Sequence, residues 1–258
     1  SMQERFIANL RKILERGEER ALLISATGTG KTYASAFAMR ELGFKRVLFL
    51  VHRVTLAKQA KNSFEKVFDK KVTMGLVGAG SYEYEKDYVF ATVETLNRDT
   101  HLFQYQPNDF DCIILDEAHH SSNNIYTKVI HYFKPKLFLG MTATPDKRED
   151  NQEGKNIYEI FHYQIAYEIR LQQAMEDNLL CPFHYFGISE IISLDDKTLQ
   201  AAKLTEEEFN QLTSDERVRH IMEQSEYYGY SGERVKGLIF CSRVKECEEL
   251  SRKFNARG

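Results

Sequence analysis

The fold is decided by the stretch Ala21-Leu22-Leu23-Ile24-Ser25-Ala26-Thr27-Gly28-Thr29-Gly30-Lys31-Thr32. Its first half is an apolar run typical of a buried strand, and its second half turns through glycines into the start of a helix. Glycines let several backbone N–H groups point at one anion, while Lys31 adds a positive charge and the Thr32 hydroxyl can bind Mg²⁺. The stretch therefore predicts a cradle for a nucleoside triphosphate, although Ser25 stands where the usual pattern has Gly or Ala. The residues expected to contact the nucleotide are Thr27, Gly28, Thr29, Gly30, Lys31 and Thr32.

The composition is that of an ordinary globular protein, with 42% hydrophobic and 28% charged residues in a chain of 258. Because the formal net charge is −3, any binding to a polyanion must come from a local basic strip. The four cysteines lack metal-ligand spacing and indicate reduced thiols, and neither a membrane span nor a secretion signal is recognisable. We therefore expect a cytoplasmic protein with no membrane partner.

Short apolar runs alternate with helical patterns along the first part of the chain. The expected strands are residues 21–25, 47–51, 72–77, 88–92, 112–115 and 137–140. Such alternation is typical of parallel strands joined by crossover helices, and ligands of such sheets bind at the carboxyl ends of the strands. The pattern predicts an α/β fold in which a parallel sheet is flanked by helices.

The sequence also suggests how the chain is divided. A first domain is expected over residues 1–180 and a second, partial domain over residues 181–258. A polar loop at 146–156 precedes a strand and a helix within 157–178 that should close the first domain. The charged, helix-favouring residues 195–232 predict a helical insertion. A strand at 237–241 and a helix at 243–254 would then resume the α/β pattern.

A second motif ends the apolar run that starts at Cys112, where Asp116 and Glu117 follow one another. Beside a phosphate cradle, Asp116 would hold Mg²⁺, and Glu117 would orient and deprotonate the attacking water. Adjacent residues leave a strand end in different directions, so the two acids can take different roles. The two motifs together predict hydrolysis of a nucleoside triphosphate.

These motifs resemble those of the superfamily 2 helicases and translocases. Residues 116–119, Asp-Glu-Ala-His, match the DEAH box, and residues 26–32 are similar to the first motif of this superfamily. Residues 142–145 resemble the third motif, residues 51–53 with Leu56 and Gln59 resemble motif Ia, and residues 92–96 resemble motif Ib. The resemblance implies ATP as the nucleotide and a RecA-like P-loop NTPase domain, followed by a helical insertion and the beginning of a second RecA-like domain.

Roles for further residues come from this resemblance alone. Gln3, on an N-terminal helix, would read the edge of the adenine, and His119 would couple the acidic box to the third motif and the second domain. Thr142 and Thr144 would relay the state of the nucleotide to the nucleic acid. The contacts expected with the nucleic acid itself are His52, Arg53, Thr92 and Thr95.

A local basic strip accompanies motif Ia. Its members are Lys45, Arg46, Arg53, Lys58, Lys61, Lys66, Lys70 and Lys71, although each lysine alone is better explained as part of a solvated helix face. The strip predicts contacts with phosphates rather than sequence-specific reading of bases. The His-Arg of motif Ia is similar to that of DNA translocases of the restriction and repair branches, so DNA is favoured over RNA.

In this superfamily, arginines from the second domain complete the ATP site. The motifs that would carry them do not occur in these residues. We therefore expect a fragment of a longer protein with further domains, which binds ATP weakly and hydrolyses it slowly or not at all. The main prediction is the motor of an ATP-dependent DNA helicase or translocase. The alternatives are an ATP-gated nucleic-acid-binding module without unwinding activity and the motor part of a restriction-type nuclease.

Overall fold

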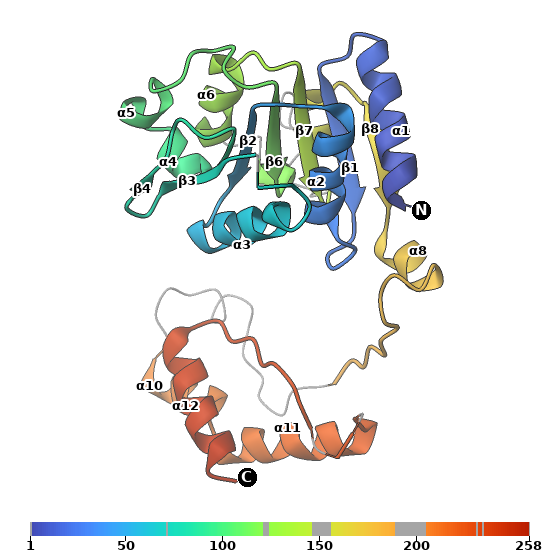
Figure 1. Ribbon diagram of the computed structural model, residues 1–258. Coiled ribbons are helices and arrows are strands. Elements are labelled where there is room, and N and C mark those ends of the chain that lie inside the picture. Colours follow the sequence, from blue (N-terminus) through green and yellow to red (C-terminus); the bar gives the residue numbers. More distant parts are fainter. Residues whose placement is uncertain are drawn as a thin grey trace. The chain divides into compact units, whose positions relative to one another are not determined.

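A computed structural model of the chain describes residues 2–70, 72–120, 124–145, 156–188, 205–230, 232–233 and 235–257. The chain divides into two compact units, Ser1–Pro182 and Phe183–Gly258 (Figure 1). Within the described residues, no helix combines the length and the apolar character needed to cross a membrane.

The first unit is built on an eight-stranded sheet with the strand order β4-β3-β5-β2-β6-β7-β1-β8. Neighbouring strands run parallel, except that β4 pairs with β3 in the antiparallel direction. Parallel neighbours require crossover connections, which the helices supply. The strands are β1 (Arg20–Ser25), β2 (Val47–Val51), β3 (Met74–Gly78), β4 (Ser81–Tyr82), β5 (Tyr88–Thr92), β6 (Cys112–Asp116), β7 (Leu137–Thr142) and β8 (Ile165–Ile169).

Helices cover both faces of this sheet (Figure 1). Alternate residues of a strand point to opposite faces, so Ala21 and Leu23 of β1 join one core cluster while Leu22 and Ile24 join the other. The first cluster includes residues of α1, α2 and α3, and the second includes residues of α4, α5, α6 and α7. The helices of this unit are α1 (Met2–Glu15), α2 (Lys31–Leu42), α3 (Val54–Glu65), α4 (Val93–Leu96), α5 (Asp99–Leu102), α6 (Asn124–Tyr132), α7 (Ile157–Ile160) and α8 (Leu171–Glu176), with a 3₁₀ turn at Ala118–His120.

The register of the strands brings the two chemical motifs to one edge of the sheet. β7 lies between β6 and β1, with Asp116 opposite Met141 and Ile24 opposite Thr142. Adjacent strands are about 4.8 Å apart, so the carboxyl ends of β1, β7 and β6 fall within roughly 10 Å of one another. The phosphate cradle and the acidic pair therefore lie side by side.

The predicted fold class is confirmed, and two strands, 47–51 and 88–92, begin and end where the sequence predicts. β7 continues to Thr142, beyond the predicted 137–140, because its backbone stays paired with β1 as far as Ile24. β8 and α8 lie within 157–178, where the sequence predicts a strand and a helix. The two-residue β4 is too short to leave a sequence pattern. Residues 146–155 of the predicted polar loop lie outside the described residues, and Asn156 caps α7.

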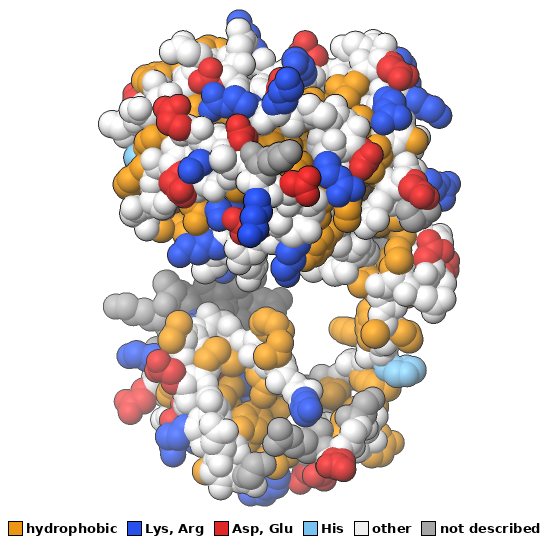
Figure 2. Space-filling view, viewed as in Figure 1, with side chains coloured by type: hydrophobic (Ala, Val, Ile, Leu, Met, Phe, Trp, Pro, Cys, Tyr) orange, Lys and Arg blue, Asp and Glu red, His pale blue; other side chains and the backbone are white. Residues whose placement is uncertain are grey.

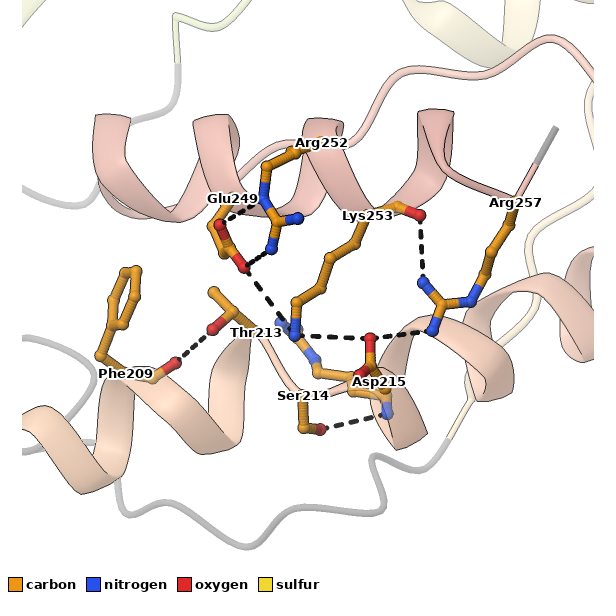
Figure 3. Close-up of polar contacts among 9 residues, drawn as sticks. Phe209, Thr213, Ser214, Asp215, Glu249, Arg252, Lys253 and Arg257 are labelled. Carbon is orange, nitrogen blue, oxygen red and sulfur yellow. Dashed lines mark hydrogen bonds and ion pairs between the residues drawn. The ribbon is translucent and has the colours of Figure 1, made fainter.

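The second unit contains the helices α10 (Glu206–Leu212), α11 (Asp215–Tyr228) and α12 (Val244–Asn255). Asp215, in the first turn of α11, accepts a hydrogen bond of 2.8 Å from Arg257 and lies 3.4 Å from Lys253 of α12 (Figure 3). The hydroxyl of Ser214 accepts a hydrogen bond from the N–H of Arg217 and so caps α11. Residues 195–204 of the predicted helical insertion lie outside the described residues.

The strand predicted at 237–241 is wrong. These residues have no regular secondary structure, and the side chains of Leu238 and Phe240 are 86% and 91% exposed. A strand must hydrogen-bond to a neighbouring strand, and the described residues of the second unit contain none. The apolar composition is that of a strand, but none of the residues that the structure describes pairs with its backbone. The helix predicted after it is present as α12.

Candidate nucleotide-binding site

The phosphate cradle of the sequence forms a tight loop between β1 and α2. Gly28 and Gly30 have φ angles of +88° and +86°, in the left-handed region that glycine adopts without strain. Gly30 is the N-cap of α2, so the loop leads directly into the positive end of a 12-residue helix. Thr27 is exposed, and Lys31 and Thr32 lie half-buried in the first turn of α2. The predicted cradle residues are therefore together at the carboxyl end of β1.

Side chains inside the loop hold its shape. The Thr29 hydroxyl donates to the Ala26 carbonyl at 2.7 Å and also contacts the Ser25 hydroxyl. The Lys31 ammonium donates to the Ser25 carbonyl at 2.9 Å, and its burial lowers the pKa of Lys31, an effect that nearby acids partly offset. Ser25, which departs from the usual pattern, thus takes part in the loop through both its hydroxyl and its carbonyl. The sequence alone did not reveal this role.

Asp116 and Glu117 lie at the end of β6. Burial, followed by the charge of Glu117, raises the pKa of Asp116, while the Glu117 N–H, Lys31 and His52 act in the opposite direction. The Glu117 N–H donates to Asp116 Oδ1 at 3.0 Å, and Glu117 itself has a φ of +51°, which is uncommon outside glycine. Such backbone geometry is often found at functional sites. Two carboxylates are thus held next to Lys31 in a partly desolvated position.

The acidic pair offers suitable ligands for Mg²⁺. Oxygen atoms of carboxylates and hydroxyls are the ligands that Mg²⁺ prefers, and it commonly uses one or two carboxylates together with substrate phosphates. Asp116 and Thr32 could provide one oxygen ligand each from the two neighbouring motifs. A cation there would also offset the burial that raises the pKa of Asp116. Among the described residues no group of three or more His, Cys, Asp or Glu could hold a metal ion by itself.

His119 connects the acidic pair to the third motif. Its Nδ1 lies 3.0 Å from the Thr142 hydroxyl oxygen and 3.3 Å from Glu117 Oε2, and only 7% of its side chain is exposed. The Thr142 hydroxyl in turn accepts the N–H of Thr144 at 3.1 Å. A protonated Nδ1 would donate to the Glu117 carboxylate, whereas an unprotonated Nδ1 would accept the Thr142 O–H. One imidazole therefore contacts both motifs.

The four predicted nucleic-acid contacts lie at the ends of β2 and β5, and His52 is close enough to Asp116 to lower the pKa of that carboxyl. His52 and Arg53 are exposed directly after β2, and Arg53 is the N-cap of α3. The Thr92 hydroxyl contacts the Thr95 hydroxyl at 2.8 Å and caps α4 by accepting the Thr95 N–H. These contacts fix both hydroxyls at the same edge of the sheet as the phosphate loop.

The predicted basic strip is not a continuous positive surface. Figure 2 shows basic and acidic side chains interspersed on the face of the first unit that carries α3. On this helix, Lys61 pairs with Glu65 at 2.6 Å. Lys71 lies outside the described residues. Any contact with phosphates along this strip would therefore come from individual side chains rather than from a uniform patch.

One flank of the phosphate loop is covered by residues that sequence reasoning missed. Ala26 packs with Ile169 and Ala174, and Leu180 packs against the same cluster. A Cβ atom added at Gly28 would lie 3.1 Å from Leu180 Cδ2, so the segment after α8 leaves little room beside the loop. Gln3 is exposed in the first turn of α1, next to Met2, which also packs on this cluster. No motif could have signalled these contacts, because they join distant parts of the chain.

The sequence of the chain matches one family model and is similar to several known proteins. The family model described as "Type III restriction enzyme, res subunit" matches residues 1–147. The chain is 26% identical over 261 residues to the type I restriction enzyme EcoAI endonuclease subunit of Escherichia coli, covering 92% of this chain and 31% of that protein. It is 30% identical over 203 residues to the putative ATP-dependent helicase IRC3 of Saccharomyces cerevisiae, covering 71% of this chain and 28% of that protein.

A solved structure shares the fold. It is that of a nuclease-deletion mutant of the type ISP restriction-modification enzyme LlaGI in complex with a DNA substrate mimic. The TM-score is 0.54 at 17% sequence identity, and the match covers 87% of this chain and 22% of that chain. The chain therefore spans only part of the proteins that it is similar to.

Proposed function

Because the chain belongs to the family described as "Type III restriction enzyme, res subunit", we propose that it couples ATP hydrolysis to binding of and movement along DNA. The chain is a superfamily 2 helicase-like motor by family and fold. Its curated relatives are named as a helicase and as restriction endonuclease subunits. Since it covers 31% and 28% of the first two, the activity of the whole protein is part of the proposal.

The phosphate loop binds the triphosphate in this proposal. The N–H groups of Thr27, Gly28, Thr29 and Gly30, at the N-terminus of α2, would donate to phosphate oxygens. Lys31, which now donates to the Ser25 carbonyl, would exchange this partner for a phosphate. Thr32 and Asp116 would hold Mg²⁺, which neutralises negative charge on the phosphates when bound. Gln3 would read the edge of the adenine.

Glu117 is the proposed base for hydrolysis. Its carboxylate would orient a water molecule and accept a proton from it as the water oxygen bonds to the γ-phosphorus and the bond to the leaving ADP oxygen breaks. The Lys31 charge beside the acids would stabilise the negative charge on the transferred group. Arginines from further domains would complete the site.

The contact of His119 with both Glu117 and Thr142 is the observation that carries the coupling. A change at Glu117 upon hydrolysis would alter the hydrogen bond between His119 and Thr142. It would thereby also alter the hydrogen bond that the Thr144 N–H donates to the Thr142 hydroxyl. Motion of the loop after β7 would then be linked to the state of the nucleotide. The DNA backbone would be held by His52, Arg53, Thr92 and Thr95 at neighbouring strand ends.

The test is an ATPase assay of the full-length protein with three nucleic acids, because the chain without its further domains is expected to hydrolyse ATP slowly or not at all. Turnover should rise when single-stranded or duplex DNA is added and should rise less with RNA of the same length. His119→Ala should keep ATP binding but lose most of the stimulation by DNA. Equal stimulation by RNA would remove the preference for DNA, and a His119→Ala variant with normal stimulation would remove the coupling role.

A second candidate function, the motor of a restriction-type nuclease, is favoured by the names of the family and of several relatives. It differs from the first only in what the rest of the polypeptide does. Purification of the full-length protein from its natural source, followed by a DNA cleavage assay with and without ATP, separates the two. ATP-dependent cleavage by that protein would support the nuclease role.

A further inference from the structure

Three aromatic rings gather at the β4 edge of the sheet, and none of them is used by the proposed ATP site. Tyr82, Tyr84 and His101, which we call the edge cluster, lie nearly parallel to one another. The Tyr82 and His101 ring centres are 5.1 Å apart with an interplanar angle of 8°, and Tyr84 makes angles of 20° and 27° with the two. Stacked rings of this kind present a flat surface.

The edge cluster is anchored to the core on one side and open on the other. The Tyr84 hydroxyl and His101 Nδ1 are 2.6 Å apart, which fixes the imidazole beside Tyr82. Tyr84 packs edge-on against Tyr105 at 5.8 Å, and Tyr105 is fully buried. Tyr82, in contrast, is 52% exposed. A large aromatic side chain is therefore held in a fixed orientation in solvent.

The strand order places this cluster in line with the proposed contacts for DNA. β4, β3, β5 and β2 are consecutive in the sheet, and His52 with Arg53 follows β2 while Thr95 follows β5. At the end of β3, a Cβ added at Gly78 would lie 3.0 Å from the Thr95 hydroxyl, so these ends are in contact. Three spacings of about 4.8 Å give a row of roughly 14 Å that ends at Tyr82.

Three of the acids near the cluster have a partner. Asp99 pairs with Lys128 at 2.6 Å, and Glu94 lies 3.8 Å from Arg98. The Glu83 carboxylate accepts the N–H of Leu76 at 3.0 Å. Three carboxylates around the rings are thus offset by a basic side chain or engaged by an amide.

We propose that the edge cluster is a stacking platform for one base of single-stranded DNA, with Tyr82 as the residue that touches the base. This inference rests on the proposed function, because it extends the row of backbone contacts by one site. Base stacking on an aromatic ring tolerates any sequence, in keeping with a motor that moves along DNA. His101 and Tyr84 are positioning residues that keep the Tyr82 ring in place.

A protein partner fits these observations less well. The exposed feature is a single ring backed by two others, and protein interfaces of useful affinity need several hundred square ångströms on each side. A single base covers an area similar to that of one ring. The contact between the end of β3 and Thr95 also makes the platform continuous with the DNA contacts.

The test combines substitutions at Tyr82 with a change in the DNA. Affinity for a fluorescent oligothymidylate is measured by anisotropy for the wild type, Tyr82→Leu and Tyr82→Phe, and again with oligonucleotides that carry one abasic position moved along the strand. Tyr82→Leu should weaken binding about tenfold, which corresponds to about 1.4 kcal/mol, and Tyr82→Phe should bind as the wild type does. One abasic position should weaken the wild type by a similar factor and leave Tyr82→Leu unaffected.

Tyr163→Leu is the matched control. Tyr163 is 63% exposed and precedes β8, so it lies at the opposite edge of the sheet, and its substitution should leave DNA affinity unchanged. Equal affinity of Tyr82→Leu and the wild type, or equal losses from the abasic position in both, would overturn the platform. If Tyr82→Leu binds DNA normally while Arg53→Ala weakens binding, the platform alone fails. If the wild type does not bind DNA at all, the proposed function and the platform fail together.

Discussion

The two units of the chain treat apolar sequence in opposite ways. In the first unit, residues such as Leu23, Ile114 and Leu139 lie in paired strands under helices and are fully buried. In the second unit, residues 237–241 have no partner strand among the described residues, and hydrophobic side chains gather on the viewed face (Figure 2). Apolar composition therefore makes a strand possible, whereas pairing with another strand creates it.

In the second unit, a buried ion pair and buried apolar side chains lie between helices α11 and α12. Glu246 of α12 is buried and lies 3.4 Å from Arg217 of α11, and the Ser242 hydroxyl donates to its carboxylate at 3.1 Å. Leu250 of α12 and Val218 of α11 are buried as well. Charged groups therefore help to hold the helices of the second unit together, whereas in the first unit the helices pack on the sheet.

The largest expected effect on stability comes from placing a carboxylate in a buried, paired strand, compared with the same change in the exposed apolar residues 237–241. Ile114→Asp should prevent the first unit from folding, because an unpaired charge among buried neighbours costs several kcal/mol, about half or more of the stability of a typical domain. Phe240→Asp should change the free energy of unfolding by less than about 0.5 kcal/mol, since Phe240 is 91% exposed. Urea denaturation followed by circular dichroism measures both. Similar effects of the two substitutions would remove the contrast between the units.

The fold of the first unit was accessible from sequence for a physical reason. Strands buried on both faces, such as 47–51 and 88–92, read as unbroken apolar runs, and two glycines with a lysine mark the phosphate loop. Such signals are local. The predicted strand at 237–241 failed because pairing is not local, and the sequence does not state whether a neighbouring strand is present.

The residues of the candidate site likewise fall into two groups, those that local sequence motifs identify and those that depend on the packing of distant segments. Lys31, Asp116 and Glu117 could be named from motifs, because their chemistry and their positions after apolar runs are written in the chain. Their roles remain predictions. The contacts of Ser25 within the loop and of Leu180 beside Gly28 could not be named, since they depend on how distant segments pack.

A smaller effect is expected at the acid that should activate water. Glu117→Gln keeps the shape of the side chain but removes the base, so hydrolysis of ATP should fall at least about 100-fold while ATP affinity changes less than about twofold. Single-turnover hydrolysis by the full-length protein with DNA present, alongside equilibrium binding of ATP, measures both quantities. Glu41→Gln, on the surface of α2, is the control for loss of a carboxylate. Unchanged hydrolysis by Glu117→Gln would exclude Glu117 as the base and would leave the first unit without its proposed chemistry.

A smaller effect on stability concerns the ion pair between α11 and α12. Arg217→Met should destabilise the second unit by about 2 kcal/mol, because the Glu246 carboxylate would stay buried without its partner. Arg252→Met removes the exposed pair with Glu249 shown in Figure 3 and should leave the melting temperature unchanged. Thermal unfolding followed by circular dichroism compares the two. Equal melting temperatures for both variants and the wild type would show that this ion pair does not hold the helices, and nucleotide binding should be unaffected in either case.

The central claim is that the first unit carries the nucleotide site, and equilibrium binding of a fluorescent ATP analogue with Mg²⁺ tests it most directly. The wild-type chain should bind the analogue saturably. Lys31→Ala should bind it at least about tenfold more weakly, because the variant loses the positive charge, now beside Asp116 and Glu117, that would contact a phosphate. Lys58→Ala removes an exposed charge of α3 and should bind as the wild type does. Equal affinities of the wild type and Lys31→Ala, or no binding by the wild type, would contradict the claim.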